Sequence, residues 1–375
     1  MRVYLLLIIC GFIGMPVGSS QHEIIQHRLN EIFDDNFQDD EPGGCILIKK
    51  GEEEIFLASY GLEDLATKKR ITPHTIFNTG SISKTFVSNG ILILHQRGKL
   101  SIDDSIYKYF PDFENKDLAQ QVTIKHLLSH TSGLPDLRNA WQNQEFYMTA
   151  KDQENWAPIK AAQELKFNPG SAFDYSNPAY NGLALIIEKV TNKPWQEFIA
   201  KNIFDPAHMT HSVITNGPHP ESGVAHAYAK NDKGQFEEYD YGEFPTFAAA
   251  GNGGIWSTVI DLVKYEKAIQ SNLLIDNALT TMSRTVFKPS HWASETDAFV
   301  GYGWFLGERF LFENSNLGVD IVYHTGSQGG FRGYHVVIPE KDIVFVALFN
   351  RPVDRFVSRI QRALSLLKEH KWLDK

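Results

Sequence analysis

Hydrophobic residues recur with two different periods along this chain. Between residues 22 and 33 they return about every 3.6 positions, which predicts an amphipathic helix. Residues 44–50 and 54–60 are short apolar runs joined by a tight turn, which predicts two antiparallel strands. The helical spacing then returns over residues 82–96, so the chain changes from strands to helices at about residue 80.

The rest of the pattern divides into a helical middle and a strand-rich end. Helical spacing predicts further helices at residues 124–128, 156–165, 180–191, 195–204 and 259–270. Strand patterns follow at residues 301–306, 319–324, 333–338 and 343–349, and a final helix is predicted at 353–370.

This order of elements predicts an α+β fold that is interrupted by a helical insertion. Residues 21–80 together with 296–375 make up the predicted α/β domain, and residues 81–295 make up a mostly helical domain. A cleft between two such domains is the expected position of a functional site.

Composition narrows the class of function. The 375 residues include 42% hydrophobic residues, which is ordinary for a folded globular protein and argues against disorder. The formal net charge is −9, and no cluster of lysine and arginine falls on a predicted face. Nucleic-acid binding requires concentrated positive charge, so the sequence argues against a nucleic-acid partner.

The first twenty residues have the pattern of an export signal. Arg2 is followed by a mostly apolar run over residues 3–13 and then by the small residues 18–20, which predicts a secretory signal peptide that is removed. The run is too short to span a bilayer. Lipidation at Cys10 is the alternative, and it is not favoured because Ile9 precedes the cysteine. After removal Cys45 is the one cysteine left, and its apolar neighbours predict a small buried side chain.

Candidate chemistry begins with Ser81 and Lys84, which lie three residues apart at the predicted start of a long helix. Residues at this spacing share one helix face, so the lysine amine can accept the serine proton without a histidine–aspartate pair. The alternative is a capping serine beside an exposed lysine. Ser105 and Ser365 also precede a lysine by three positions, but neither follows a glycine or opens a long helix after strands.

Two later stretches supply further polar groups. Tyr175-Ser176-Asn177 follows a Pro-Gly turn and precedes a helical pattern, and of the 14 tyrosines Tyr175 is the one with asparagine two residues on. Residues 323–330 end a predicted strand in a glycine-rich segment, where backbone N–H groups can approach a ligand closely.

These stretches, in this order, carry a resemblance. Residues 81–84, 175–177 and 324–326 look like the three motifs of the serine β-lactamase and penicillin-binding-protein-like superfamily, in its class C β-lactamase, DD-peptidase and esterase branch. Residues 124–135 and 250–254 match the same family, and the resemblance runs from about residue 22 to the C-terminus. It implies the α+β fold of that family: an antiparallel sheet flanked by the N- and C-terminal helices, with an inserted helical domain.

The resemblance also implies roles for individual residues. Ser81 would attack the scissile carbonyl and form an acyl-enzyme, while Lys84 and Tyr175 would share the proton transfers. A cationic lysine would favour the tyrosine phenolate, and the choice of base stays open between the two. The N–H groups of Ser81 and Ser327 would form the oxyanion hole.

The resemblance also implies that the remaining motif residues bind the substrate. Asn177 would bind the acyl-side amide, and Thr325 a polar group on the far side, with Gly326 between Thr325 and Ser327. His324 is the departure, because β-lactamases of this branch usually have lysine there. An unperturbed histidine is mostly neutral at pH 7, so we expect a substrate carboxylate to be held less firmly. Arg332 is either a source of replacement charge or a surface residue.

We therefore expect an exported serine hydrolase, periplasmic or extracellular, that acts on D-alanyl peptides, small esters or D-amino-acid amides. A class C-like β-lactamase is the alternative within the same class. A non-catalytic penicillin-recognition or scaffolding module is the alternative from another class. We expect a small-molecule or peptide substrate as the partner, and no membrane span after signal removal.

Cofactor and metal chemistry are not favoured by the sequence. His126 and His130 have a metal-ligand spacing, as do His208 and His211, but no HExxH glutamate accompanies either pair. The Gly-x-Gly at residues 301–303 lies within a strand pattern instead of opening a helix, which argues against a dinucleotide loop. The expected reaction needs neither metal nor cofactor.

Overall fold

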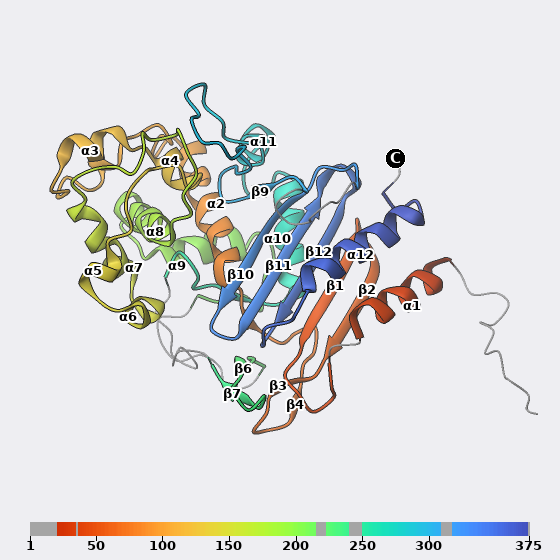
Figure 1. Cartoon of the computed structure of the whole chain (residues 1–375). Helices are drawn as coiled ribbons and strands as arrows, with labels where there is room; N and C mark the ends of the chain where they lie inside the picture. The colour runs from red at the N-terminus through yellow and green to blue at the C-terminus, as the bar shows by residue number, and fades with distance from the viewer. Residues whose placement is uncertain (1–20, 35–36, 215–222, 240–249, 309–316, 374–375) are drawn as a thin grey trace, which may run out of the picture.

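A six-stranded antiparallel sheet forms the centre of the computed structural model (Figure 1), with the strand order β2-β1-β12-β11-β10-β9. The structure describes residues 21–34, 37–214, 223–239, 250–308 and 317–373. The predicted signal peptide and Cys10 lie outside these residues.

The sheet strands are β1 (Gly44–Lys50), β2 (Glu53–Tyr60), β9 (Phe305–Leu306), β10 (Val322–Gln328), β11 (Phe331–Ile338) and β12 (Ile343–Phe349). Short pairs of strands outside it are β3 (Leu62–Asp64) with β4 (Lys69–Arg70), β5 (Phe77–Asn78) with β8 (Trp256–Ser257), and β6 (Tyr228–Lys230) with β7 (Phe236–Glu238).

The α-helices are α1 (Gln21–Phe33), α2 (Ser83–Gln96), α3 (Lys116–Gln121), α4 (Ile124–Leu128), α5 (Arg138–Trp141), α6 (Gln144–Thr149), α7 (Asp152–Trp156), α8 (Asn177–Thr191), α9 (Trp195–Ile199), α10 (Val259–Gln270), α11 (Asn277–Ser283) and α12 (Phe356–Glu369). A π-helical turn, Ala200–Phe204, continues α9, and 3₁₀ turns occur at Gly80–Ile82, Ile106–Lys108, Ala157–Ala161 and Pro339–Lys341.

Both faces of the sheet are covered, as Figure 1 shows. The terminal helices α1 and α12 pack on one face, where a hydrophobic cluster joins them to the alternate side chains of the strands. The other face packs against α10 and the helical region, in a second and larger cluster. This arrangement confirms the predicted α+β fold with terminal helices on the sheet. The predicted domain boundaries at residues 80 and 296 stay a prediction.

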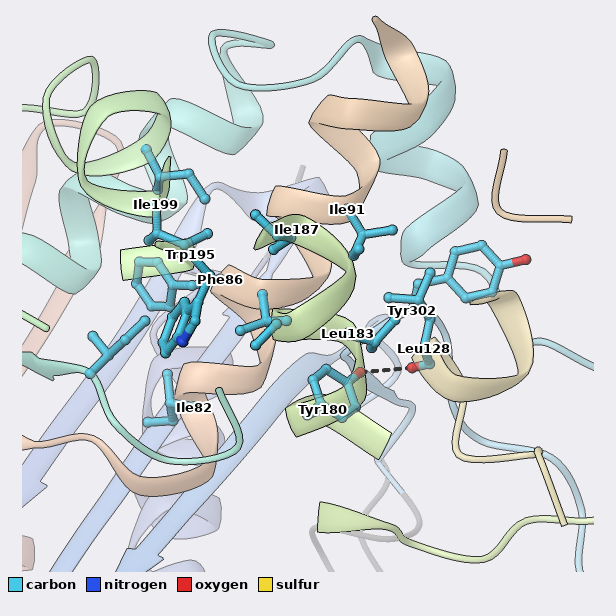
Figure 2. Close-up of a cluster of buried hydrophobic side chains, with 14 of the residues drawn as sticks. Ile82, Phe86, Ile91, Leu128, Tyr180, Leu183, Ile187, Trp195, Ile199 and Tyr302 are labelled. Atoms are coloured by element: carbon cyan, nitrogen blue, oxygen red, sulfur yellow. Dashed lines mark hydrogen bonds between the residues drawn. The ribbon is translucent and has the colours of Figure 1, made fainter. Parts of the chain in front are cut away.

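Helices α2 and α8 pack against each other at the centre of the helical region. Figure 2 shows Phe86 and Ile91 of α2 in one buried cluster with Leu183 and Ile187 of α8. The hydroxyl of Tyr180, which is also buried there, donates a 2.7 Å hydrogen bond to the carbonyl of Leu128. Full burial of a large apolar side chain stabilises a fold by about 1.5–3 kcal/mol. This cluster therefore fixes α2, the helix that follows Ser81.

Several sequence predictions are confirmed by the structure. The helices at 124–128 and 259–270 and the strands at 44–50 and 343–349 have the predicted bounds. Cys45 is fully buried, and burial raises the pKa of its thiol to about 12, as expected for an unreactive side chain.

Other predictions are wrong in their bounds. The helix predicted at 156–165 is a 3₁₀ turn, Ala157–Ala161, which follows α7, and Pro158 lies in its first turn. The strand predicted at 301–306 shortens to β9, because Gly303 adopts a positive φ of 81°. The last helix begins at Phe356 because Arg355 is in the left-handed conformation, with φ 53°.

The most consequential difference concerns β10. The sequence predicts a strand that ends at about His324, in a glycine-rich segment. The structure instead begins the strand at Val322 and continues it through Gln328, paired along its length with β11. The motif at 324–326 therefore lies within a strand and not at its end.

Among the described residues, no helix is both long enough and apolar enough to cross a bilayer.

Candidate functional site

Ser81 and Lys84 are in direct contact. Ser81 lies in the 3₁₀ turn that precedes α2, and Lys84 lies in the first turn of that helix. The Lys84 Nζ donates to Ser81 Oγ at 2.9 Å and to the carbonyl oxygen of Asn252 at 2.6 Å. The two contacts fix the amine between the serine and the loop that precedes β8.

The environment of Lys84 is dry. The side chain is fully buried, and burial lowers its pKa well below the ordinary value of 10.5 because the charged form loses its hydration. The positive charge of Arg138 lowers the same pKa further. A neutral amine next to a serine hydroxyl is a suitable proton acceptor.

Tyr175 lies over the same amine, whose nitrogen is 5.1 Å from the centre of the tyrosine ring. Burial of its hydroxyl raises the pKa of Tyr175 to about 12, although a hydrogen bond with Ser81 acts in the opposite direction. Burial therefore opposes the phenolate that the sequence analysis expects, whereas the pKa of the lysine falls. Which of the two groups is the base stays a prediction.

His130 orients this tyrosine, a contact that the sequence analysis missed. Its imidazole stacks on the Tyr175 ring at 4.4 Å, and its Nδ1 accepts a 3.0 Å hydrogen bond from the Ser176 N–H. An accepting Nδ1 requires the neutral ring, and burial lowers the pKa of His130 well below 6.5.

The strand β10 approaches the Ser81 turn very closely. A Cβ atom added at Gly326 would lie 2.0 Å from the Thr79 carbonyl oxygen, and one added at Gly80 would lie 2.7 Å from the Ser327 nitrogen. Only glycine fits at these two positions without a shift of the backbone. The closeness brings the backbone of Ser327 beside the Ser81 turn, where two N–H groups can serve one oxyanion.

His324 is buried in the middle of β10, with 2% of its surface exposed, and packs 4.9 Å from the ring of Phe305. Its Nδ1 lies 2.7 Å from the carbonyl oxygen of Thr325, so this nitrogen carries the proton. Burial lowers its pKa to about 3. The histidine is therefore neutral at physiological pH and supplies no positive charge.

Two cavities flank Ser81. A small one, of about 110 Å³, is lined by Ser81, Asn177, Asn252 and Arg138 among others. A larger one, of about 580 Å³, is lined by Tyr175, Thr325, Gly326, Arg332 and several aromatic rings. Ser327 lines both. Of the eight residues proposed from the sequence, seven line these cavities or hold Ser81 directly, and His324 lies behind them.

Arg138 is a cavity residue for which the sequence gave no signal. Its guanidinium binds both carboxylate oxygens of Asp136 and donates a 2.7 Å hydrogen bond to Asn155 Oδ1. These partners hold a positive charge at the mouth of the small cavity, within electrostatic reach of Lys84.

Asp152 is a further residue whose role the sequence analysis did not identify. Its fully buried carboxylate accepts hydrogen bonds from the Gly251 N–H at 2.8 Å, from Asn181 Nδ2 at 2.7 Å and from Trp195 Nε1 at 2.8 Å. Asn181 also donates to Asn252 Oδ1 at 3.0 Å. Asp152 thus fixes the loop whose carbonyl holds the Lys84 amine, and burial raises its pKa to about 7.

Within the described ranges, no group of three or more His, Cys, Asp and Glu side chains is placed to hold a metal ion. The Nδ1 of His126 contacts Thr123, and the Nδ1 of His130 accepts a hydrogen bond from the Ser176 N–H.

The family model described as Beta-lactamase matches residues 24–368, a span that contains every residue of this site. The chain belongs to the beta-lactamase family. It is a serine hydrolase that acts on amide or ester bonds.

Similar proteins of known name and structure agree with this family. Penicillin-binding protein 4* of Bacillus subtilis (strain 168) is 26% identical over 356 residues, which cover 92% of this chain and 75% of that protein. The octameric penicillin-binding protein homologue from Pyrococcus abyssi superposes with a TM-score of 0.74 at 26% identity, over 92% of this chain and 78% of that one.

A third similarity shows the shared fold. The D-amino acid amidase from Ochrobactrum anthropi SV3, in complex with D-phenylalanine, superposes with a TM-score of 0.74 at 23% identity. The match covers 92% of this chain and 99% of that one.

Asp152 provides a test of how this beta-lactamase family member positions its lysine. In Asp152→Asn an amide replaces a carboxylate that accepts three hydrogen bonds, so at least one donor loses its partner. Such a loss costs about 1–3 kcal/mol. We expect a lower unfolding temperature and a lower kcat with little change in KM, because the Asn252 carbonyl is displaced from Lys84.

The pH dependence separates this role from general destabilisation. The folded pKa of Asp152, about 7, lies above the ordinary value of 3.8. The stability contribution of this carboxyl is therefore complete below 3.8 and is lost as pH rises through about 7. The stability difference between wild type and Asp152→Asn should narrow over that range in denaturant unfolding. A constant difference would contradict the assignment, and Asp232→Asn, at an exposed carboxyl, is the control.

Proposed function

We propose that this chain is an exported serine hydrolase that forms an acyl-enzyme on Ser81 and cleaves D-alanyl peptides, small esters or D-amino-acid amides. The observation that carries the proposal is the 2.9 Å contact between Ser81 Oγ and a buried Lys84 amine whose pKa is depressed. A serine needs an adjacent base to become a nucleophile, and this amine is such a base.

In the proposed reaction the neutral Lys84 takes the Ser81 proton as Oγ forms a bond to the substrate carbonyl. The negative charge that develops on the carbonyl oxygen is stabilised by the N–H groups of Ser81 and Ser327. The bond to the leaving group then breaks, and Tyr175 passes a proton to the departing oxygen or nitrogen while Lys84 reprotonates it. Attack by water on the acyl-enzyme releases Ser81.

The substrate class is supported by two separate observations. The D-amino acid amidase relative was solved in complex with D-phenylalanine, which supports D-amino-acid derivatives as substrates. The neutral His324 gives no fixed charge for the carboxylate of a β-lactam, which favours esters and amides. Export is supported by the pattern of the first twenty residues, with a periplasmic or extracellular location.

Ser81→Ala is the direct test of the acyl-enzyme. Loss of the nucleophile should reduce nitrophenyl ester hydrolysis by at least about a thousandfold and abolish the covalent adduct in intact-protein mass spectrometry. Ser105→Ala is the matched control, because Ser105 precedes Lys108 by the same spacing but lies outside the site. Unaltered turnover in Ser81→Ala would favour the non-catalytic recognition module.

The family model favours a second candidate, hydrolysis of β-lactams. The two candidates differ in whether water can release the penicilloyl or cephalosporoyl group from Ser81. We expect nitrophenyl esters to turn over while fluorescent penicillin labels the protein slowly. Fast steady-state hydrolysis of a cephalosporin, followed by absorbance, would reverse this ranking.

The pH profile tests Lys84 as the base. Because only the neutral amine accepts a proton, kcat/KM should rise with pH through the Lys84 pKa and reach its plateau well below pH 10.5. His324 is already neutral above about pH 3, so His324→Gln should leave the midpoint of this rise in place. A rate that still increases towards pH 10.5 would contradict a depressed lysine pKa, as measured with an ester and corrected for spontaneous hydrolysis.

A further inference from the structure

Aromatic side chains form much of the wall of the larger cavity beside Tyr175. Phe173, Phe299, Phe305 and Tyr334 line it, and each of these side chains is only half-buried. The rings of Phe173 and Phe299 lie 4.8 Å apart, and those of Phe299 and Phe305 lie stacked at 5.7 Å. An aromatic ring that is packed on one side and open on the other can pack against the ring of a ligand.

This aromatic cavity is continuous with the catalytic residues. The Phe305 ring stacks 6.3 Å from the Tyr175 ring, and the wall continues through Thr325, Gly326 and Ser327. One substrate can therefore reach from a carbonyl at Ser81 into the aromatic cavity, because Ser327 lines both cavities. The cavity is part of the substrate site and not a separate surface pocket.

The two cavities share Ser327 and otherwise have different linings, so they can hold different parts of one substrate. Tyr175, which returns a proton to the leaving group in the proposed reaction, lines the aromatic cavity. Asn177 and Arg138 line the small one, which holds about 110 Å³ against about 580 Å³. A leaving group must depart beside its proton donor, so the aromatic cavity belongs to the leaving group and the small polar cavity to the acyl group.

We propose that the aromatic cavity is a leaving-group subsite, and that the preferred substrates join a small polar acyl group, such as a D-alanyl group, to an aromatic leaving group. This inference rests on the proposed function. In the reaction the Ser81 Oγ–carbon bond forms, the bond to the aromatic alcohol or amine breaks, and that group takes the proton held at Tyr175 and Lys84. Water then releases the free acid.

The test compares D-alanine benzyl ester with D-alanine methyl ester on the full-length protein. The two leaving alcohols have similar acidity, so a difference in kcat/KM reports binding of the ring. A hydrophobic pocket discriminates by about tenfold or more for each added apolar group of this kind, and we expect the benzyl ester to be favoured by at least that factor. A second pair, D-phenylalanine methyl ester against D-alanine methyl ester, should show no such preference for the larger acyl group.

Phe299→Ala locates the preference in this cavity. Phe299 contacts the other rings of the wall, and its removal should reduce the benzyl-to-methyl ratio several-fold, while Phe299→Leu should keep part of it. Phe236→Ala is the matched control, because this half-buried phenylalanine on β7 is not part of the cavity wall. Reporting a ratio on one protein sample removes the effect of partial unfolding.

The outcomes separate this inference from the proposed function. A benzyl-to-methyl ratio near one, a ratio unchanged in Phe299→Ala, or a preference that follows the acyl group would overturn the leaving-group subsite while turnover of the methyl esters still supports the hydrolase. Turnover that survives in Ser81→Ala would instead overturn the acyl-enzyme, and the subsite with it.

Discussion

The buried amine of Lys84 is the constraint on which the rest of the site depends. It has a carbonyl and a serine hydroxyl as hydrogen-bond partners, and no carboxylate of the described residues forms an ion pair with it, so its neutral form is favoured. A charged lysine at this depth would cost several kcal/mol unless it were paired. The fold therefore prepares the base through exclusion of water. This explains why the lysine pKa falls while the tyrosine pKa rises, since the same burial acts on opposite charges.

Exclusion of water requires that several elements meet without gaps. The cluster between α2 and α8 fixes the helix that carries Lys84, and the glycines of β10 and of the Ser81 turn allow two backbones to touch. The buried Asp152 holds the Asn252 loop from behind. Each of these contacts helps to fix the position of the Lys84 Nζ. Polar groups far from Ser81 in sequence are consequently part of the catalytic arrangement, although none of them touches substrate.

The sequence was sufficient for the elements with a strong period and for the motif residues. The continuous apolar runs of β1 and β12 and the helical spacing in α10 are local patterns, and burial of these elements preserves them. The roles of His130 and Asp152 were not identified, because they arise from partners tens of residues away that no local pattern encodes. Arg138 was not identified because its place beside the small cavity is a property of the folded chain. Burial opposes the expected phenolate for a related reason. Residue types show which charges can interact, whereas burial decides which of them are present.

The two cavities show how such a site can select substrates without a strong ion pair at its centre. With His324 neutral, a substrate carboxylate finds no charge at the position where lysine usually stands, and the positive charges that line the cavities are those of Arg332 and Arg138. Shape and apolar contact can then contribute more to selection. Half-buried rings offer that contact, since burial of apolar surface is worth about 25 cal/mol per Å² and does not require a fixed charge. Apolar selection is also insensitive to ionic strength, whereas recognition of a carboxylate weakens as salt screens it. Histidine in place of lysine and an aromatic wall beside Tyr175 are therefore consistent with the proposed reaction, in which a neutral lysine activates the nucleophile and apolar packing favours the leaving group.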